Sequence, residues 1–159
     1  MSGLRWAAAL LLTAAGFCAG DARRQRLATR RRALEETAGL LARLRQEIGY
    51  RRADLGPLYR TLAAEYGPAS ALGRAMGRAD GFGQMPPPAP LAAEEAACFA
   101  ECFAALGRAD AGQECARLDY YLARFQSFLD RVREEEARSA SIDRRLGLAA
   151  GAVLGLLIL

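Results

Sequence analysis

The sequence predicts an all-α protein, with a small antiparallel helical bundle flanked by an N-terminal and a C-terminal membrane helix. Strong helix formers (Ala, Leu, Arg and Glu) dominate the chain, and β-branched residues are scarce. Two uncharged apolar segments lie near the two ends of the chain. We therefore divide the 159 residues into a transmembrane helix at 4–20, a cytoplasmic helical domain at 21–145 and a second transmembrane helix at 146–159.

The flanking charges predict the topology of the two apolar segments, 6–20 and 146–159. Each segment is short for a helix that crosses a hydrocarbon core of about 30 Å. Arginines follow the first segment, and Arg144 and Arg145 precede the second. Each apolar segment therefore has its arginines on the side of the central domain. Arginine-rich flanks mark the cytoplasmic side, which predicts a hairpin with both termini outside. The arginines after the first segment, predicted to contact lipid headgroups or a partner, are Arg23, Arg24, Arg26, Arg30, Arg31 and Arg32.

A cleaved signal peptide is an alternative interpretation of the N-terminal segment. Arg5, the apolar run and the small residues near Cys18 and Gly20 partly fit such a peptide. Cleavage would give a mature start near Asp21. The protein would then be an envelope adaptor with a single C-terminal anchor.

Glycines recur at helical spacing in both apolar segments. Gly147, Gly151 and Gly155 are four residues apart, and Gly16 and Gly20 repeat this spacing near the N-terminus. Small residues at this interval allow close packing of helices in membranes. We expect these glycines to form a packing face, with the other segment or a neighbouring subunit as the partner.

Apolar spacing and helix signals predict the order of helices in the central domain. A first helix over about 22–52 carries the stripe Leu27, Leu34, Ala38, Leu41, Leu44 and Ile48. Asp54 and Pro57 start a second helix, which ends at Gly67 and Pro68. A short helix with Leu72 and Met76 precedes a Pro/Gly-rich loop over 80–90. The next helix begins at Pro90 or Leu91 and directs Phe99, Phe103 and Leu106 inward.

The last helix is expected over about 111–141, after a hinge. Its stripe is Cys115, Leu118, Leu122, Phe125, Leu129 and Val132. Gly107 can end the preceding helix in a left-handed conformation, and Asp110 stands three residues before Gln113, as in a helix cap. The tetrapeptide "GRAD" also occurs at 77–80, where it leads into the proline loop. We interpret the copy at 107–110 as a hinge and cap.

Composition argues against an enzyme. All 22 basic residues are arginine, and the chain has no histidine and no lysine, which removes the commonest general base and the Schiff-base nucleophile. A carboxylate enzyme using Glu47, Glu101 or Asp110 is a weaker alternative. Cys98, Cys102 and Cys115 could supply thiolates to a metal, but without CxxC or histidine we interpret them as core residues. We expect no cofactor and no nucleic-acid binding.

Several segments, taken in order, resemble the stage III sporulation protein AB family of endospore-forming bacteria. "LARLRQEIGYRRADLGPLYRTLA" (41–63) resembles a family segment through Glu47, Ile48, Tyr50, Pro57 and Leu58. "LGRAD" with Gln113 resembles the central hinge of the family, although Ala109 replaces the usual serine. The charged last helix running into a glycine-rich end also resembles it.

The resemblance implies a fold, a location and partners. The central domain would be similar to the cytoplasmic helical domain of type II secretion F platform proteins. The protein would be a scaffold in the secretion-like complex that joins mother cell and forespore during engulfment, in the mother-cell membrane around the forespore. Other proteins of the stage III sporulation A operon, including a cytoplasmic secretion-type ATPase, would be its partners, and self-association is a further expectation.

Overall fold

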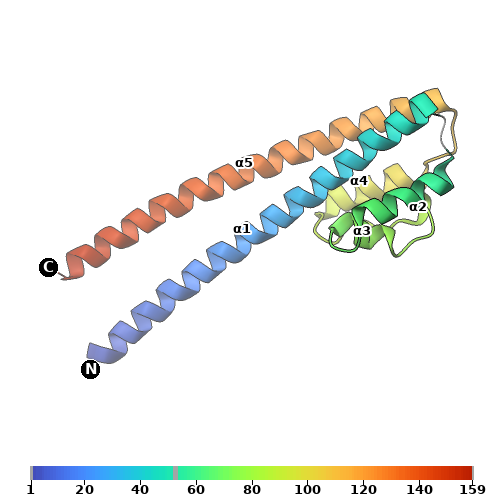
Figure 1. The fold of residues 1–159 in the computed structure, drawn as a ribbon. Helices are drawn as coiled ribbons and strands as arrows, with labels where there is room; N and C mark the ends of the chain where they lie inside the picture. Colours follow the sequence, from blue (N-terminus) through green and yellow to red (C-terminus); the bar gives the residue numbers. More distant parts are fainter. Residues whose placement is uncertain (1, 52–53, 159) are drawn as a thin grey trace. The chain divides into compact units, whose positions relative to one another are not determined.

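The computed structural model describes the backbone of residues 2–51 and 54–158 and the side chains of 21–51 and 54–139. Every regular element in these residues is helical, which confirms the all-α prediction. The elements in order are α1 (Ser2–Gln46), η1 (Glu47–Arg51), α2 (Leu55–Tyr66), α3 (Ala71–Met76), η2 (Phe82–Gln84), α4 (Ala93–Ala104) and α5 (Ala111–Ile158) (Figure 1).

The chain forms two compact units. One unit spans Thr29–Arg131 and is called the helical unit below; the other consists of Met1–Ala28 and Val132–Leu159. Helices α1 and α5 each extend without a break from one unit into the other. The predicted boundaries at residues 20 and 146 stay predictions.

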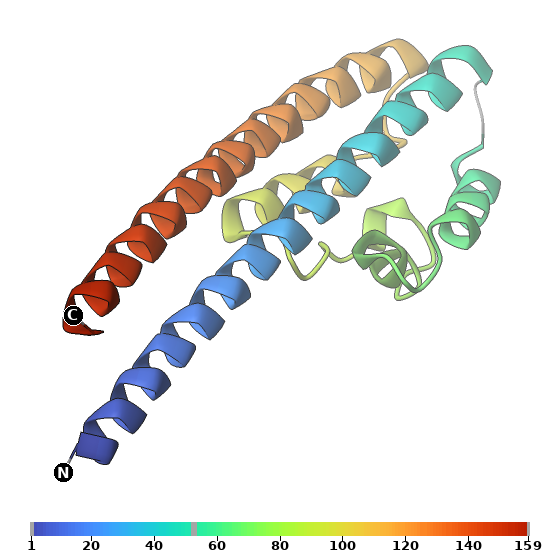
Figure 2. The same cartoon turned by 60° about the vertical axis from the view of Figure 1, so that its left-hand side comes forward.

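Within the helical unit, α1 and α5 run antiparallel, and α2, α3 and α4 gather beside α1 (Figures 1 and 2). The Arg45 guanidinium on α1 forms an ion pair with the Asp119 carboxylate on α5. The buried side chains include most of the two predicted stripes; they are Leu34, Ala38, Leu41 and Leu44 on α1, Ile48 in η1, and Leu118, Phe125, Leu129 and Val132 on α5.

An aromatic cluster forms the core beneath the shorter helices. The Phe82 ring lies 4.9 Å from the Tyr59 ring, edge to face, and 6.1 Å from the Phe103 ring. The Phe99 and Phe103 centroids are 4.5 Å apart. The Tyr59 hydroxyl donates to the carbonyl oxygen of Met76 at 2.7 Å, so the buried phenol is satisfied. The proline loop thus supplies Phe82 to the core.

Caps set the start and end of α2 as predicted. The Asp54 carboxylate accepts a hydrogen bond from the Gly56 amide at 3.3 Å. Gly67 ends the helix with a φ of 63°, a left-handed conformation that glycine adopts readily. Glu36 on α1 reaches the start of α3, where its carboxylate accepts from the Leu72 amide at 3.1 Å.

Two predicted boundaries were wrong. The first helix does not stay α-helical to residue 52, because α1 ends at Gln46 and widens into the π-helical turn η1. The fourth helix begins at Ala93 and not at Pro90 or Leu91. Residues 88–91 instead form a turn in which the Leu91 amide donates to the Pro88 carbonyl oxygen at 3.1 Å.

Candidate interaction site

The hinge between α4 and α5 has the geometry predicted from its sequence. Gly107 has a φ of 84°, and a Cβ atom there would lie 2.7 Å from Leu55 Cδ1. The left-handed backbone conformation therefore favours glycine, and a larger residue would also have to displace the Leu55 side chain. Asp110 Oδ1 accepts from the Gln113 amide at 2.8 Å, which caps the first turn of α5. Arg108 is exposed to solvent.

A buried carboxylate that the sequence analysis missed holds this hinge in place. Glu114 is 2% exposed, and its Oε1 accepts from the Gly107 amide at 3.0 Å and the Ala109 amide at 3.2 Å. Its Oε2 accepts from the Arg117 guanidinium at 2.7 Å. Glu114 lies four residues before Leu118, so its position on the apolar stripe of α5 was the available signal.

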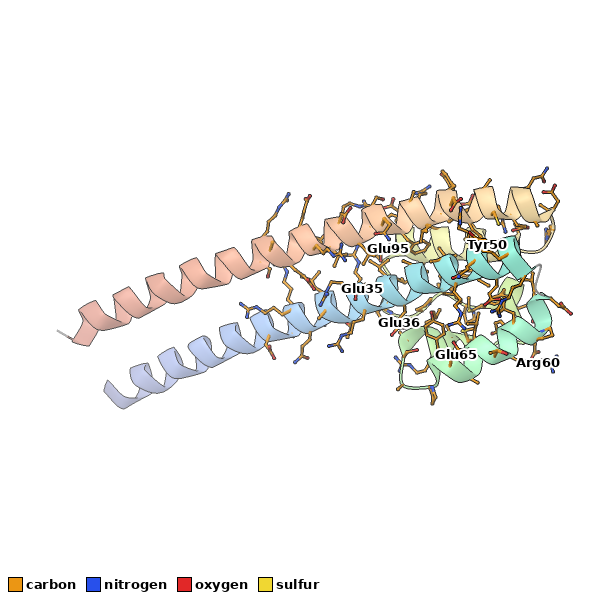
Figure 3. All side chains as sticks on the ribbon, turned by 45° about the horizontal axis from the view of Figure 1, so that its top comes forward. Glu35, Glu36, Tyr50, Arg60, Glu65 and Glu95 are labelled. Carbon is orange, nitrogen blue, oxygen red and sulfur yellow. The ribbon has the colours of Figure 1, made fainter. Side chains whose placement is uncertain are left out.

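An open groove of about 510 Å³, called the hinge groove below, lies at this end of the helical unit. Its lining comes from η1, the start of α2 and the hinge, and consists of Ile48, Leu55, Gly107, Ala109, Asp110, Ala111, Gly112 and Glu114. Tyr50, two residues from Ile48 in η1, is 84% exposed and lies near the end of α1 (Figure 3). Short π-helical turns recur at functional sites. The hinge groove, the exposed Tyr50 and the π-helical turn η1 thus all lie at the same end of the helical unit.

The cap at Asp110 permits a test of the hinge. Asp110→Ala is expected to lower the free energy of unfolding by about 1 kcal/mol, because the Gln113 amide loses its acceptor. Asp110→Asn is expected to change it by only a few tenths of a kcal/mol, since Asn is an equally good cap. Urea denaturation followed by circular dichroism measures both. Equal stability of the Ala variant and the unsubstituted protein would contradict the assignment.

A second buried carboxylate joins α1 to the start of α4. Glu95 is 1% exposed and accepts from Arg30 Nε at 3.1 Å and from the Arg30 terminal nitrogen at 2.6 Å. It also accepts from the Ala92 amide at 2.8 Å, which fixes the first turn of α4. Like Glu114, Glu95 was missed, although it lies four residues before Phe99 on the buried face.

The predicted arginine cluster is divided between the two units. Arg23, Arg24 and Arg26 are exposed on the part of α1 that belongs to 1–28. Arg30 binds Glu95 inside the helical unit, and Arg31 forms a 3.2 Å pair with Glu35 one turn away. The guanidinium of Arg30 therefore stabilises the folded helical unit. Headgroup or partner contact by the six arginines, Arg32 included, stays a prediction.

The predicted packing glycines and the membrane helices that carry them fall outside the described side chains. This concerns Gly16, Gly20, Gly147, Gly151 and Gly155. Within the part of the chain that the structure describes, no helix combines the length and apolarity needed to span a bilayer.

Two of the three cysteines that the sequence indicated as core residues are buried, whereas the third is not fully so. Cys98 and Cys102 are buried on α4, and burial raises the pKa of both thiols, that of Cys102 to about 12. Cys115 is half-buried. Among the described residues, no group of three or more Cys, Asp or Glu side chains is arranged to hold a metal ion. The absence of a cofactor stays a prediction.

The burial predicts the order of thiol labelling. Iodoacetamide at about pH 8 is expected to alkylate Cys115 in the folded protein and to reach Cys98 and Cys102 only after unfolding, because the thiolate is the reactive form. Peptide mapping by mass spectrometry after timed quenching distinguishes the three sites. Alkylation of Cys102 as fast as Cys115 in the folded protein would show that α4 opens readily.

The carboxylates of the enzyme alternative lie on three different elements. Glu47 is in η1, where it pairs with Arg51 at 3.7 Å, Glu101 is exposed on α4, and Asp110 is at the hinge. Asp110 lines the hinge groove, but Glu47 and Glu101 do not. The arrangement gives no specific support to paired acid–base chemistry.

The model of the family described as stage III sporulation protein AB matches residues 5–81 and 79–159. The chain belongs to the stage III sporulation protein AB family. Membership gives the protein a role in sporulation. No curated protein matches the chain, and no solved structure matches it.

The segments that carry the stage III sporulation protein AB resemblance meet at the hinge groove. Ile48 and Leu55 come from the segment 41–63, and the other lining residues come from the hinge and the start of α5. The exposed Tyr50 belongs to the first of these segments. The hinge groove is therefore the candidate functional site of the helical unit.

Proposed function

We propose that this protein is a non-enzymatic, membrane-anchored scaffold of the secretion-like complex between mother cell and forespore. Membership in the stage III sporulation protein AB family along nearly the whole chain carries this proposal. The anchors are the apolar segments 4–20 and 146–159, and residues 21–145 face the mother-cell cytoplasm. The protein resides in the mother-cell membrane that surrounds the forespore.

The continuous helices support a scaffold with two terminal anchors. Helix α1 begins at Ser2 and α5 ends at Ile158, so both apolar segments are helical. Within the helical unit, the buried acidic groups Glu95 and Glu114 are saturated by arginines and backbone amides. These two carboxylates hold helix ends in place and therefore stabilise the fold. Since their acceptors are already occupied, the helical unit is better suited to binding a partner than to catalysing a reaction.

The proposal is tested by deleting the gene in the source organism and complementing it with tagged variants. We expect heat-resistant spores to fall strongly in the deletion strain and to return with the unsubstituted chain. Pull-down during engulfment should recover proteins of the same operon, including a secretion-type ATPase. Normal sporulation without the protein would overturn the role.

The topology requires its own experiment. Protease added to mother-cell protoplasts should spare residues 21–145, whereas lysis should expose them. Replacing Arg23, Arg24 and Arg26 by Glu should weaken membrane orientation, because each arginine near an anionic surface contributes about 1 kcal/mol. Arg30→Glu is unsuitable for this purpose, because it also breaks the pair with Glu95. A mature N-terminus near Asp21 would instead support the adaptor with a cleaved signal peptide.

A further inference from the structure

The shape of the hinge groove favours a polypeptide as its occupant. Small-molecule sites enclose most of the ligand surface, whereas this groove of about 510 Å³ is open and is lined largely by backbone and small side chains at 107–112. Its apolar lining consists of Leu55, Ala109, Ala111 and the buried Ile48, which is 7% exposed. That surface suits one or two apolar side chains of a docked segment.

The exposed aromatic residue at the same end of the helical unit also supports a polypeptide as the occupant. Tyr50 is 84% exposed, and only one other large hydrophobic residue in the described part of the chain, Tyr120 at 56%, is comparably accessible. Tyrosine is enriched among the residues that dominate binding energy at protein interfaces. Because η1 is a π-helical turn, it places Tyr50 at a different angle from a regular continuation of α1.

The charge of the lining selects the chemistry of the partner. Among the residues that the structure describes, the charged side chains in the lining are Asp110 and Glu114, and none of the lining residues is basic. Glu114 is saturated by two amides and Arg117. Asp110 is exposed and uses only Oδ1, for the Gln113 amide, so Oδ2 can accept a further donor. Arg108 lies in the hinge but not in the lining.

We propose that the hinge groove binds a segment of a partner protein in which an apolar side chain stands beside an arginine or lysine. The apolar side chain packs on Ile48 and Leu55, the cation binds Asp110, and Tyr50 covers the docked segment at the rim. This proposal rests on the proposed scaffold function, because it assigns the surface through which the scaffold meets a partner.

The test uses the full chain in lipid nanodiscs and two fluorescent peptides. One short amphipathic peptide contains leucine, alanine and arginine, and its twin has glutamate at each arginine. Anisotropy titration should show binding of the arginine peptide and little binding of the twin. Asp110→Asn should weaken binding about tenfold, because a hydrogen bond to a charged group is lost while the helix cap is kept. Tyr50→Ala should weaken it by a similar factor.

Matched variants serve as controls. Asp80→Asn changes the aspartate of the other "GRAD" copy, and Tyr120→Ala removes the other exposed tyrosine, so both should leave the affinity unchanged. Equal binding of the two peptides, or an unchanged affinity in Asp110→Asn and Tyr50→Ala, would overturn the proposal. Peptide binding does not depend on sporulation. A normal deletion strain would therefore refute the scaffold role, and a failed titration would refute only the docking surface.

Discussion

Replacing Glu95 by alanine is expected to lower the free energy of unfolding by about 3–5 kcal/mol. The carboxylate is 1% exposed and receives hydrogen bonds from Arg30 and from the Ala92 amide. Its removal deletes the carboxylate that accepts from the partly buried Arg30 guanidinium and from the first turn of α4. Urea denaturation of the full chain in detergent, followed by circular dichroism, measures the loss.

Two further variants separate the buried pair from ordinary surface charge. Glu35→Ala removes the partner of Arg31 on the same helix, where both side chains are more than a third exposed, and should cost only a few tenths of a kcal/mol. The double substitution Arg30→Met with Glu95→Met should recover much of the stability, since apolar pairs often replace buried ion pairs well. A loss in Glu95→Ala no larger than in Glu35→Ala would contradict the assigned role.

Replacing Gly73 by alanine is expected to destabilise the helical unit by about 3 kcal/mol, because the new methyl group meets backbone. A Cβ atom at Gly73 would lie 1.7 Å from the carbonyl oxygen of Gly67, so α2 and α3 must separate at this turn. For a unit of this size the melting temperature should fall by roughly 12–24 °C. Differential scanning calorimetry of the full chain measures the change.

A second glycine provides the control for this substitution. A Cβ atom at Gly112, in the first turn of α5, meets nothing within 4 Å. Gly112→Ala should therefore leave stability unchanged or raise it by about 0.5–1 kcal/mol through helix propensity. A melting temperature of Gly73→Ala that matches the unsubstituted protein would show that the turn between α2 and α3 relaxes at little cost.

The sequence revealed features of the fold that depend on local spacing. The stripes on α1 and α5, the cap at Asp54 and the hinge at Gly107 and Asp110 each follow from residues within a few positions of one another. The start of α4 was misplaced because it depends on the turn at 88–91 and on Glu95, whose partner Arg30 is 65 residues away.

The hinge groove could be predicted only in part. Tyr50, Asp110 and Gly107 were singled out from the sequence, but nothing in their spacing indicated that η1 and the hinge line one groove. The two buried glutamates were missed because charged residues are expected at the surface. Their place on apolar stripes was the sequence signal, but the arginine and amide partners appear only in the fold.

The long-range pairing of α1 with α5 also determines when the helical unit can finish folding during synthesis. Arg45 and its partner Asp119 are 74 residues apart, and the apolar face of α1 leaves the ribosome before α4 and α5 exist to cover it. At about 5–20 residues per second this delay lasts roughly 4–15 s. The face of α1 that packs on α5 is thus uncovered until α5 is made, and its leucines are accessible to chaperones or to a lipid surface throughout that interval.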